Sequence, residues 1–346
     1  MESAGAPTDS VGLRVEERVA FDLAGHTTHR LAFPQIVTSW DRLQSLIRAT
    51  VPDLRYHLGH RMVGYTATGS VVRVEFDKGF SAEADLLVGA DGYRSSVHRQ
   101  AFPEVQPAYA GYIAWRGVAA EADLPDDLRA SAFSQFSFFL PAGDGLMLAY
   151  PIAGADNDLS VGHRRYHWGW YRLVDPGLLP DLLTDERGVT HAVSIPPPLV
   201  RRVVIQQMRD AAEGALAPQF AAILEQVKAP FFTPIYDHAA PSLVSDRVAL
   251  VGDAPVLARP HIGAGVTKAA ADAVALVACL SAAGTLAAGL AAYNAERLPL
   301  DLAAYQRSRY LGEYLTPRYR TEAEKADWAR RHNIEAILQN TAVLDT

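Results

Sequence analysis

The stretch Arg247-Val-Ala-Leu-Val-Gly-Asp-Ala-Pro-Val-Leu-Ala-Arg-Pro-His-Ile-Gly-Ala-Gly265 predicts a buried strand, a loop and the start of a helix. Val248–Val251 is a short apolar run rich in β-branched residues, which is typical of a buried strand, and it stops at Gly252-Asp253. From Val266 onward apolar residues recur at helical spacing, and a helix start flanked by glycine offers unpaired N–H groups to an anion. We therefore expect Asp253 at the carboxyl end of its strand, where α/β sheets usually place ligand-binding side chains.

An earlier strand ends in a turn of the same kind. Leu86–Val88 is apolar and runs into Gly89-Ala-Asp-Gly92. We expect the two strands to be buried neighbours in one sheet, with Asp91 and Asp253 at the same edge. Single carboxylates in such turns accept hydrogen bonds from ribose hydroxyls, while the turn amides face phosphate. A packing unit without a ligand is the alternative for either stretch taken alone.

The pair of turns resembles the two internal fingerprints of the class A FAD-dependent aromatic hydroxylases of the p-hydroxybenzoate hydroxylase type. Gly89–Gly92 with Arg94, Ser95 and Arg99 matches the Asp-Gly motif of that class, and Gly252-Asp253 with Pro260, Gly263 and Gly265 matches its Gly-Asp motif. Residues 108–118, 148–154 and 258–261 resemble the 2,6-dihydroxypyridine 3-hydroxylase branch. The resemblance covers roughly residues 14 to 320.

The resemblance implies an α/β fold, with a partial Rossmann-like FAD-binding domain and an inserted antiparallel β-sheet that forms a substrate-binding domain. The implied FAD-binding domain comprises residues 38–107 and 241–316, and the substrate-binding domain comprises 14–37 and 108–240. Residues 317–346 are expected to form a C-terminal helix and tail.

The two motifs imply a set of cofactor-binding residues: Asp91, Gly92, Arg94, Ser95, Gly252, Asp253, Pro260, Gly263, Ala264 and Gly265. In this class, FAD is reduced by NADH or NADPH, and an electron-rich ring is hydroxylated through a flavin C4a-hydroperoxide. The expected substrate is therefore a small aromatic or hydroxypyridine ring.

Few side chains are expected to act on the substrate. His261, in the loop before the Gly-Ala-Gly turn, is the candidate for substrate hydrogen bonding or proton transfer, and a loop-bracing histidine is the alternative. Tyr112, Trp115 and Tyr150 are candidates for an aromatic wall. Arg116 could neutralise negative charge on the substrate, or it could form an internal salt bridge.

The sequence departs from the class at its beginning. It contains no Gly-x-Gly-x-x-Gly turn, which in the class binds the ADP half of FAD. Either the reading frame is truncated, or this is a natural variant without that unit. We expect FAD to bind weakly or not at all, and enzymatic activity stays an open question. The rival hypothesis is a flavin-free remnant that binds a small aromatic ligand or catalyses a non-redox reaction.

A second departure lies in the helix expected near Thr38. Trp40 stands where many class members carry an arginine directed at the cofactor, and Arg42 lies two places on. An aromatic residue here is typical of the dihydroxypyridine branch that the chain resembles, and core packing is the alternative for Trp40.

Composition excludes several other classes. The net charge of −7 over 346 residues, without a basic run, argues against a nucleic-acid partner. The single cysteine, Cys279, excludes an internal disulfide framework and a Cys-based metal site, and we expect no metal. There is no Gly-x-Ser-x-Gly hydrolase turn. No apolar run approaches ~20 residues, and the first ten residues lack a signal-peptide pattern, so we expect a cytoplasmic protein without a membrane partner that could form a homodimer.

Overall fold

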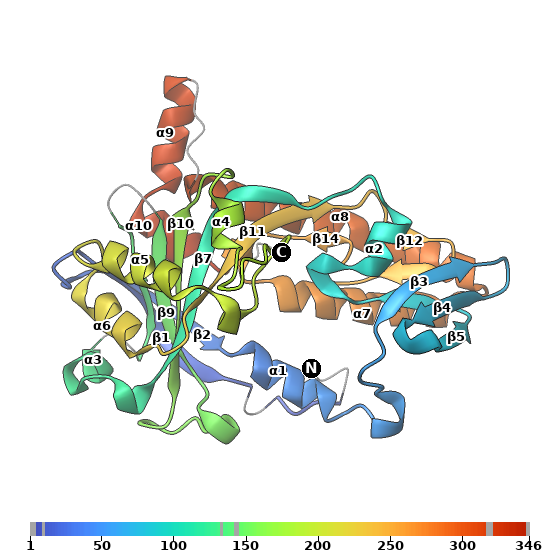
Figure 1. Ribbon diagram of the computed structural model, residues 1–346, viewed down its shortest axis with the longest axis horizontal. Coiled ribbons are helices and arrows are strands. Elements are labelled where there is room, and N and C mark those ends of the chain that lie inside the picture. The colour runs from blue at the N-terminus through green and yellow to red at the C-terminus, as the bar shows by residue number, and fades with distance from the viewer. Residues whose placement is uncertain (1–4, 9–10, 132–133, 142–144, 316–320, 344–346) are drawn as a thin grey trace. The chain divides into compact units, whose positions relative to one another are not determined.

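The structure, a computed structural model, describes residues 5–8, 11–131, 134–141, 145–315 and 321–343 (Figure 1). The chain divides into two compact units. Unit 1 comprises Met1–Thr50, Tyr109–Ile235 and Glu313–Asn340, and unit 2 comprises Val51–Ala108, Tyr236–Gly312 and Thr341–Thr346. Residues 38–50, which the sequence analysis assigned to the FAD-binding domain, cluster with unit 1.

Unit 1 is built on a large, mostly antiparallel sheet in the order β11-β7-β10-β9-β8-β1-β2. Strand β1 pairs in parallel with β8, whereas β1-β2, β8-β9, β9-β10 and β10-β7 are antiparallel. The strands are β1 (Leu13–Phe21), β2 (Thr27–Val37), β7 (Ala108–Ala120), β8 (Phe136–Phe139), β9 (Leu146–Ile152), β10 (Arg165–Leu173) and β11 (Phe231–Ala239). The predicted antiparallel sheet in an α/β fold is confirmed.

The two faces of this sheet carry separate hydrophobic cores, because successive side chains of a strand point to opposite faces. On one face, Ile113 and Trp115 pack with residues of α5 and α6, which cover that side (Figure 1). On the other face, Tyr112 and Ala114 share a core with Tyr314. The helices of unit 1 are α1 (Trp40–Arg48), α3 (Asp126–Ser131), α4 (Leu179–Leu182), α5 (Arg202–Ala212), α6 (Pro218–Gln226), α9 (Glu322–Arg331) and α10 (Ile334–Asn340).

Unit 2 contains the strands that carry the two motifs. In the sheet β12-β13-β6, β13 (Val248–Leu250) pairs in parallel with β6 (Leu87–Gly89), so that Leu250 lies opposite Gly89. This confirms that the two strands are neighbours whose carboxyl ends meet at one edge. The expectation that both are buried is wrong for β6, because Val88 is 43% exposed. Among the described residues, β6 is the end strand of this sheet, which leaves its outer side uncovered.

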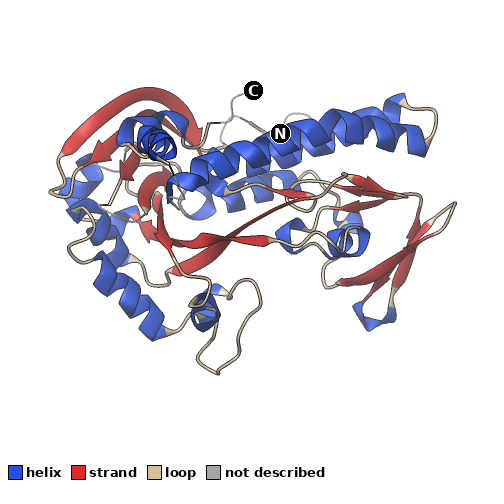
Figure 2. Ribbon diagram, turned by 90° about the horizontal axis from the view of Figure 1, so that it is seen from above, coloured by secondary structure: helices blue, strands red, loops and turns tan. Residues whose placement is uncertain are grey.

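The remaining elements of unit 2 are a second small sheet and the helices around the motif strands. The small sheet is formed by β3 (Met62–Ala67), β4 (Val72–Phe76) and β5 (Ser81–Ala84), and the helices are α2 (Ser96–Ala101), α7 (Gly265–Ala282) and α8 (Leu286–Gly312). Strand β12 (Val244–Ser245) belongs to the motif sheet, and β14 (Val256–Leu257) pairs with His238 and Ala239 at the end of β11 as the eighth strand of the large sheet. Helix α8 continues through Pro299. Figure 2 shows the long helices α7 and α8 lying alongside one another, in agreement with their extensive contact.

Helix α7 is, within the described residues, the one helix long and apolar enough to cross a membrane by length and composition alone. A core helix of a soluble protein passes the same test, so the match is weak evidence for a membrane span. Lys268 and Asp272 of this helix are buried and paired with charged groups of α8. Helix α7 therefore packs against α8 through these ion pairs.

Candidate functional site

The Asp91 turn is held together by its own hydrogen bonds. Asp91 Oδ2 accepts hydrogen bonds from the N–H groups of Ser96 (2.7 Å) and Val97 (3.3 Å) at the start of α2. Ser95 Oγ accepts a third from the N–H of His98 (2.8 Å). Asp91 is exposed, but one of its oxygens thus serves to cap a helix.

The Asp253 turn is arranged differently. Gly252 has a φ of 64°, and a Cβ on it would lie 3.1 Å from the Cβ of Ala269, so glycine here permits the close approach of α7. The half-buried Asp253 carboxylate accepts no hydrogen bond from any described residue. Burial raises the pKa of Asp253, while Lys268 lowers it and Asp272 raises it further. An under-bonded carboxylate at a strand end is suited to accept a hydrogen bond from a ligand hydroxyl.

The loop between β14 and α7 carries the predicted residues Pro260 to Gly265. His261 lies in a short 3-10 helix, Pro260–Ile262, and is 3% exposed. Gly263 has a φ of 60°, and a Cβ there would lie 2.6 Å from the Cβ of Ala342. The N–H of Ala342 also donates to the carbonyl of His261 (2.7 Å). The backbone at Gly263 is therefore closely approached by residue Ala342 of the chain itself.

The start of α7 is open. Ala264 is its N-cap residue without a side-chain capping bond, and Gly265, Val266 and Thr267 are exposed. The first amides of a helix have no partner within it, so this first turn presents donors and the positive end of a helix dipole to solvent. That arrangement fits the anion-facing role predicted for Gly263–Gly265.

The four predicted substrate residues in unit 1 do not share one face of the sheet. Trp115 packs against Phe232, with ring centroids 5.1 Å apart, and lines a cavity of about 180 Å³ on the face covered by α5. Tyr112, Arg116 and Tyr150 belong to the opposite face. Strand alternation separates Trp115 from Arg116, although the two are adjacent in sequence.

Arg116 lies among aromatic side chains. It is half-buried, and its charge influences the pKa values of Tyr150, His167 and Tyr171, which surround it. In the part of the chain that the structure describes, Arg116 has Tyr171 as a hydrogen-bond partner and pairs with no carboxylate, so the internal salt bridge offered as its alternative role is not formed there. A half-buried cation without an internal counter-ion favours an anionic ligand.

His167 is a neighbour that the sequence analysis did not propose as a site residue. Its ring lies 5.0 Å from that of Tyr150, centroid to centroid, and forms no hydrogen bond to the described residues. Burial and, secondarily, Arg116 lower the pKa of His167 to about 3, so its imidazole is neutral at physiological pH. The pairing of His167 with Tyr150 depends on the register between β9 and β10, which a single sequence does not reveal.

Trp40, at the start of α1, is 73% exposed. The core-packing interpretation of this residue is therefore wrong within the structure, and its side chain is accessible to a ligand.

Comparison with known proteins points to the class that the two motifs resemble. A family model described as FAD binding domain-like matches residues 109–237, nearly all of which lie in unit 1 and not in unit 2, which carries the two motifs. The 2,6-dihydroxypyridine 3-monooxygenase of Paenarthrobacter nicotinovorans is 34% identical over 237 residues, which are 68% of this chain and 58% of that protein. The solved structure of 2,6-dihydroxypyridine-3-hydroxylase from Arthrobacter nicotinovorans matches with a TM-score of 0.84 at 28% identity, covering 91% of this chain and 79% of that one. The chain is similar to the class A flavoprotein hydroxylases.

Other relatives extend the same class. Salicylate hydroxylase of Pseudomonas putida is 28% identical over 278 residues, 76% of this chain and 59% of that protein. The Klebsiella pneumoniae HpxO structure complexed with FAD and uric acid has a TM-score of 0.71 at 21% identity, covers 95% of this chain and 82% of that one, and supports the fold alone. The chain spans about three fifths of the length of the curated relatives named here. The recognition made from the two motifs is confirmed.

Proposed function

We propose that this chain carries the FAD-binding and substrate-binding surfaces of a monooxygenase that hydroxylates an electron-rich aromatic or hydroxypyridine ring. The observation that carries the proposal is Asp253: a half-buried carboxylate without a hydrogen-bond partner among the described residues, placed at the carboxyl end of β13. It lies at the same sheet edge as the Asp91 turn, because β6 and β13 are parallel neighbours.

The residues of unit 2 fit a flavin nucleotide. Asp253 would accept a hydrogen bond from a cofactor hydroxyl, and the open first turn of α7 would face negative charge. The turn amides around Gly92, next to Arg94, would lie toward phosphate. When bound and reduced by NADH or NADPH, FAD supplies the activated oxygen for the hydroxylation. On this proposal, unit 2 is the FAD-binding domain.

The residues of unit 1 fit a flat, acidic substrate. Arg116 would pair with a ring hydroxyl in its anionic form and so hold the ring electron-rich, while the half-buried Tyr150 would contact the ring. Tyr112, which was predicted for the same aromatic wall, is fully buried in the core of that face. His167, neutral beside Arg116, would accept or donate one hydrogen bond without adding charge. His261 stays the proposed residue for proton transfer. Trp115 was proposed for the same aromatic wall, but it lies on the other face.

The proposed partner is a small aromatic compound. A homodimer, a cytoplasmic location and the choice between NADH and NADPH stay predictions from the sequence. The rival function, a flavin-free protein that binds an aromatic ligand, would use the Arg116 surface alone.

One experiment separates the two functions. The purified chain is titrated with FAD, followed by flavin fluorescence, and NADH and NADPH oxidation is measured with and without 2,6-dihydroxypyridine. The monooxygenase proposal expects FAD binding that is weakened by Asp253→Ala, and aromatic binding in calorimetry that is weakened by Arg116→Met. Aromatic binding that is unaffected by FAD, with no FAD binding by the wild type, would favour the rival.

A further inference from the structure

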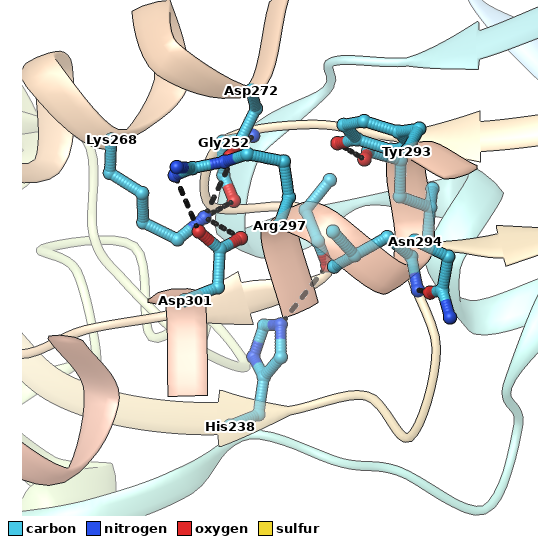
Figure 3. A network of polar contacts seen from close by, with 11 residues as sticks. His238, Gly252, Lys268, Asp272, Tyr293, Asn294, Arg297 and Asp301 are labelled. Atoms are coloured by element: carbon cyan, nitrogen blue, oxygen red, sulfur yellow. Dashed lines mark hydrogen bonds and ion pairs between the residues drawn. The ribbon is translucent and has the colours of Figure 1, made fainter. Parts of the chain in front are cut away.

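Four charged side chains are buried between α7 and α8 (Figure 3). Asp272 and Asp301 are fully buried, Lys268 is 3% exposed, and the side chain of Arg297 is 12% exposed. Lys268 Nζ lies 3.1 Å from Asp272 Oδ2 and 2.9 Å from Asp301 Oδ2. Arg297 bridges the same two carboxylates, through Nε to Asp272 Oδ1 (2.9 Å) and through a terminal nitrogen to Asp301 Oδ1 (3.0 Å). The group is electrically balanced, with two cations and two anions.

This cluster holds the backbone of the Gly-Asp turn. The N–H of Gly252 donates to Asp272 Oδ2 (2.9 Å), and Lys268 Nζ donates to the carbonyl of Gly252 (2.7 Å). The hydroxyl of Tyr293 on α8 donates to the carbonyl of Leu250, two residues before Gly252 (2.8 Å). Both polar backbone groups of Gly252 thus end on charged side chains of α7, directly before Asp253.

Helix packing alone does not require such a cluster. Burying ion pairs incurs a desolvation penalty, and apolar side chains of similar volume often stabilise a protein as well or better. The hydrogen bonds that a buried charge makes to a backbone amide or carbonyl are directional, so they fix the orientation of one peptide. Here the held peptides are the two that flank Gly252, and the second of them leads into Asp253 and sets where its side chain points.

We propose that Lys268, Asp272, Arg297 and Asp301 form a positioning network that fixes the Gly252 peptide and thereby aims Asp253 at a hydroxyl group of the flavin cofactor. The inference rests on the proposed function and deepens it, because it assigns a role to residues on α7 and α8 that do not belong to the turn itself. The sequence contains a trace of the network: two oppositely charged pairs at i, i+4 spacing, Lys268–Asp272 and Arg297–Asp301, each within a mostly apolar helix.

The test uses the full chain and two readouts, hydrogen exchange at the Gly252 amide and the affinity for FAD. Lys268→Met removes the donor to the Gly252 carbonyl and should speed Gly252 exchange and weaken FAD binding about 10- to 100-fold, the cost of a lost hydrogen bond to a charged group. Lys268→Arg keeps a cationic donor and should restore part of both. Val277→Ala, at an exposed position of the same helix, is the matched control and should change neither.

Asp301→Asn provides a second variant of nearly unchanged shape, in case Lys268→Met does not fold. It should loosen the hold on Lys268 and Arg297 and speed Gly252 exchange about tenfold relative to Val277→Ala. Folded variants at Lys268 and Asp301 that leave Gly252 exchange unchanged would overturn the inference.

The outcomes also separate this inference from the proposed function. If Asp253→Ala weakens FAD binding but the network variants do not, the cofactor role of Asp253 stands and the positioning role is overturned. If the wild type binds no FAD, the proposed function fails. In that case, faster Gly252 exchange in the network variants would still show that the network holds the turn. The proposed target of Asp253, a flavin hydroxyl, would be overturned with the function.

Discussion

The Asp91 and Asp253 turns are similar in sequence but differ in how their aspartates and glycines are hydrogen-bonded. Each follows one of two parallel neighbouring strands and each carries one aspartate beside glycine. Asp91 is exposed and hydrogen-bonded to the start of its own helix, α2. Asp253 is half-buried and not hydrogen-bonded to the described residues, while the glycine before it is held from both sides by α7. The difference shows that the first turn supports itself locally, whereas the second depends on residues 16 to 49 positions further along the chain.

The difference in hydrogen bonding suggests that Asp91 contributes to the stability of the fold and Asp253 to cofactor binding. In the Asp91 turn, the carboxylate stabilises a helix start and so contributes to folding. In the Asp253 turn, the carboxylate contributes no such bond, and its partial burial disfavours its charge, which the raised pKa reflects. We therefore expect the two aspartates to respond to substitution in different ways.

The largest expected effect lies in the network behind the second turn. Asp272→Ala leaves Lys268 and Arg297 with one carboxylate between them and removes the acceptor of the Gly252 N–H. Breaking a buried ion pair by removing one partner costs about 3–5 kcal/mol. The free energy of unfolding, measured in urea, should fall by that amount. A loss below about 1 kcal/mol would show that the network is relaxed or hydrated in solution.

Next comes Asp253→Ala, which should change binding and leave stability nearly unchanged. Removing a carboxylate without hydrogen bonds breaks no stabilising contact, and because burial disfavours its charge, the free energy of unfolding should stay the same or rise slightly. The same variant should bind FAD about 10- to 100-fold more weakly, measured by fluorescence titration. A large loss of stability with unchanged FAD affinity would reverse the contrast between the two turns.

The raised pKa of Asp253 predicts a pH-dependent difference in stability between the wild type and Asp253→Asn. Because the pKa of Asp253 is raised in the folded state, that state binds a proton more readily than the unfolded chain does. Wild type should therefore gain stability relative to Asp253→Asn as the pH falls from neutral through the raised pKa to about 3.8, and should lose it again as the pH rises. The difference can change by at most about 1.4 kcal/mol per pH unit. Urea titrations of both proteins between pH 7.5 and 4 measure it, and a constant difference would mean that Asp253 has an ordinary pKa.

The sequence predicted what depends on neighbouring residues. Leu87–Gly89 and Val248–Leu250 were predicted to be neighbours because each ends in a Gly/Asp turn, and the helix from residue 265 was predicted from its apolar spacing. The different hydrogen-bonding roles of Asp91 and Asp253 could not be predicted from the sequence around each turn. The acceptor bonds of Asp91 depend on how the chain turns into α2, and those of Gly252 depend on the packing of α7 against α8.

The substrate residues show the same limit. Aromatic composition pointed to β7 and β9, but the assignment of Trp115 to one aromatic wall with Tyr112 and Tyr150 overlooked the alternation of side chains along β7. His167 and Tyr171 lie beside Arg116 because β10 pairs with both β7 and β9. Register between strands distant in sequence is set by the whole sheet, so a single sequence does not reveal it.

The smallest expected effect concerns the first turn, and it tests the contrast from the other side. Asp91→Ala removes the acceptor for the N–H groups of Ser96 and Val97, and loss of such a cap costs about 0.5–2 kcal/mol of stability. Ser95→Ala removes the neighbouring bond to His98 and is the matched comparison, with a similar expected cost. Both variants should lower the midpoint of urea unfolding while weakening FAD binding less than Asp253→Ala does, since the turn amides proposed to face phosphate remain. If Asp91→Ala instead weakened FAD binding as much as Asp253→Ala without loss of stability, Asp91 would be a cofactor ligand first and a helix cap second, and the two turns would be equivalent after all.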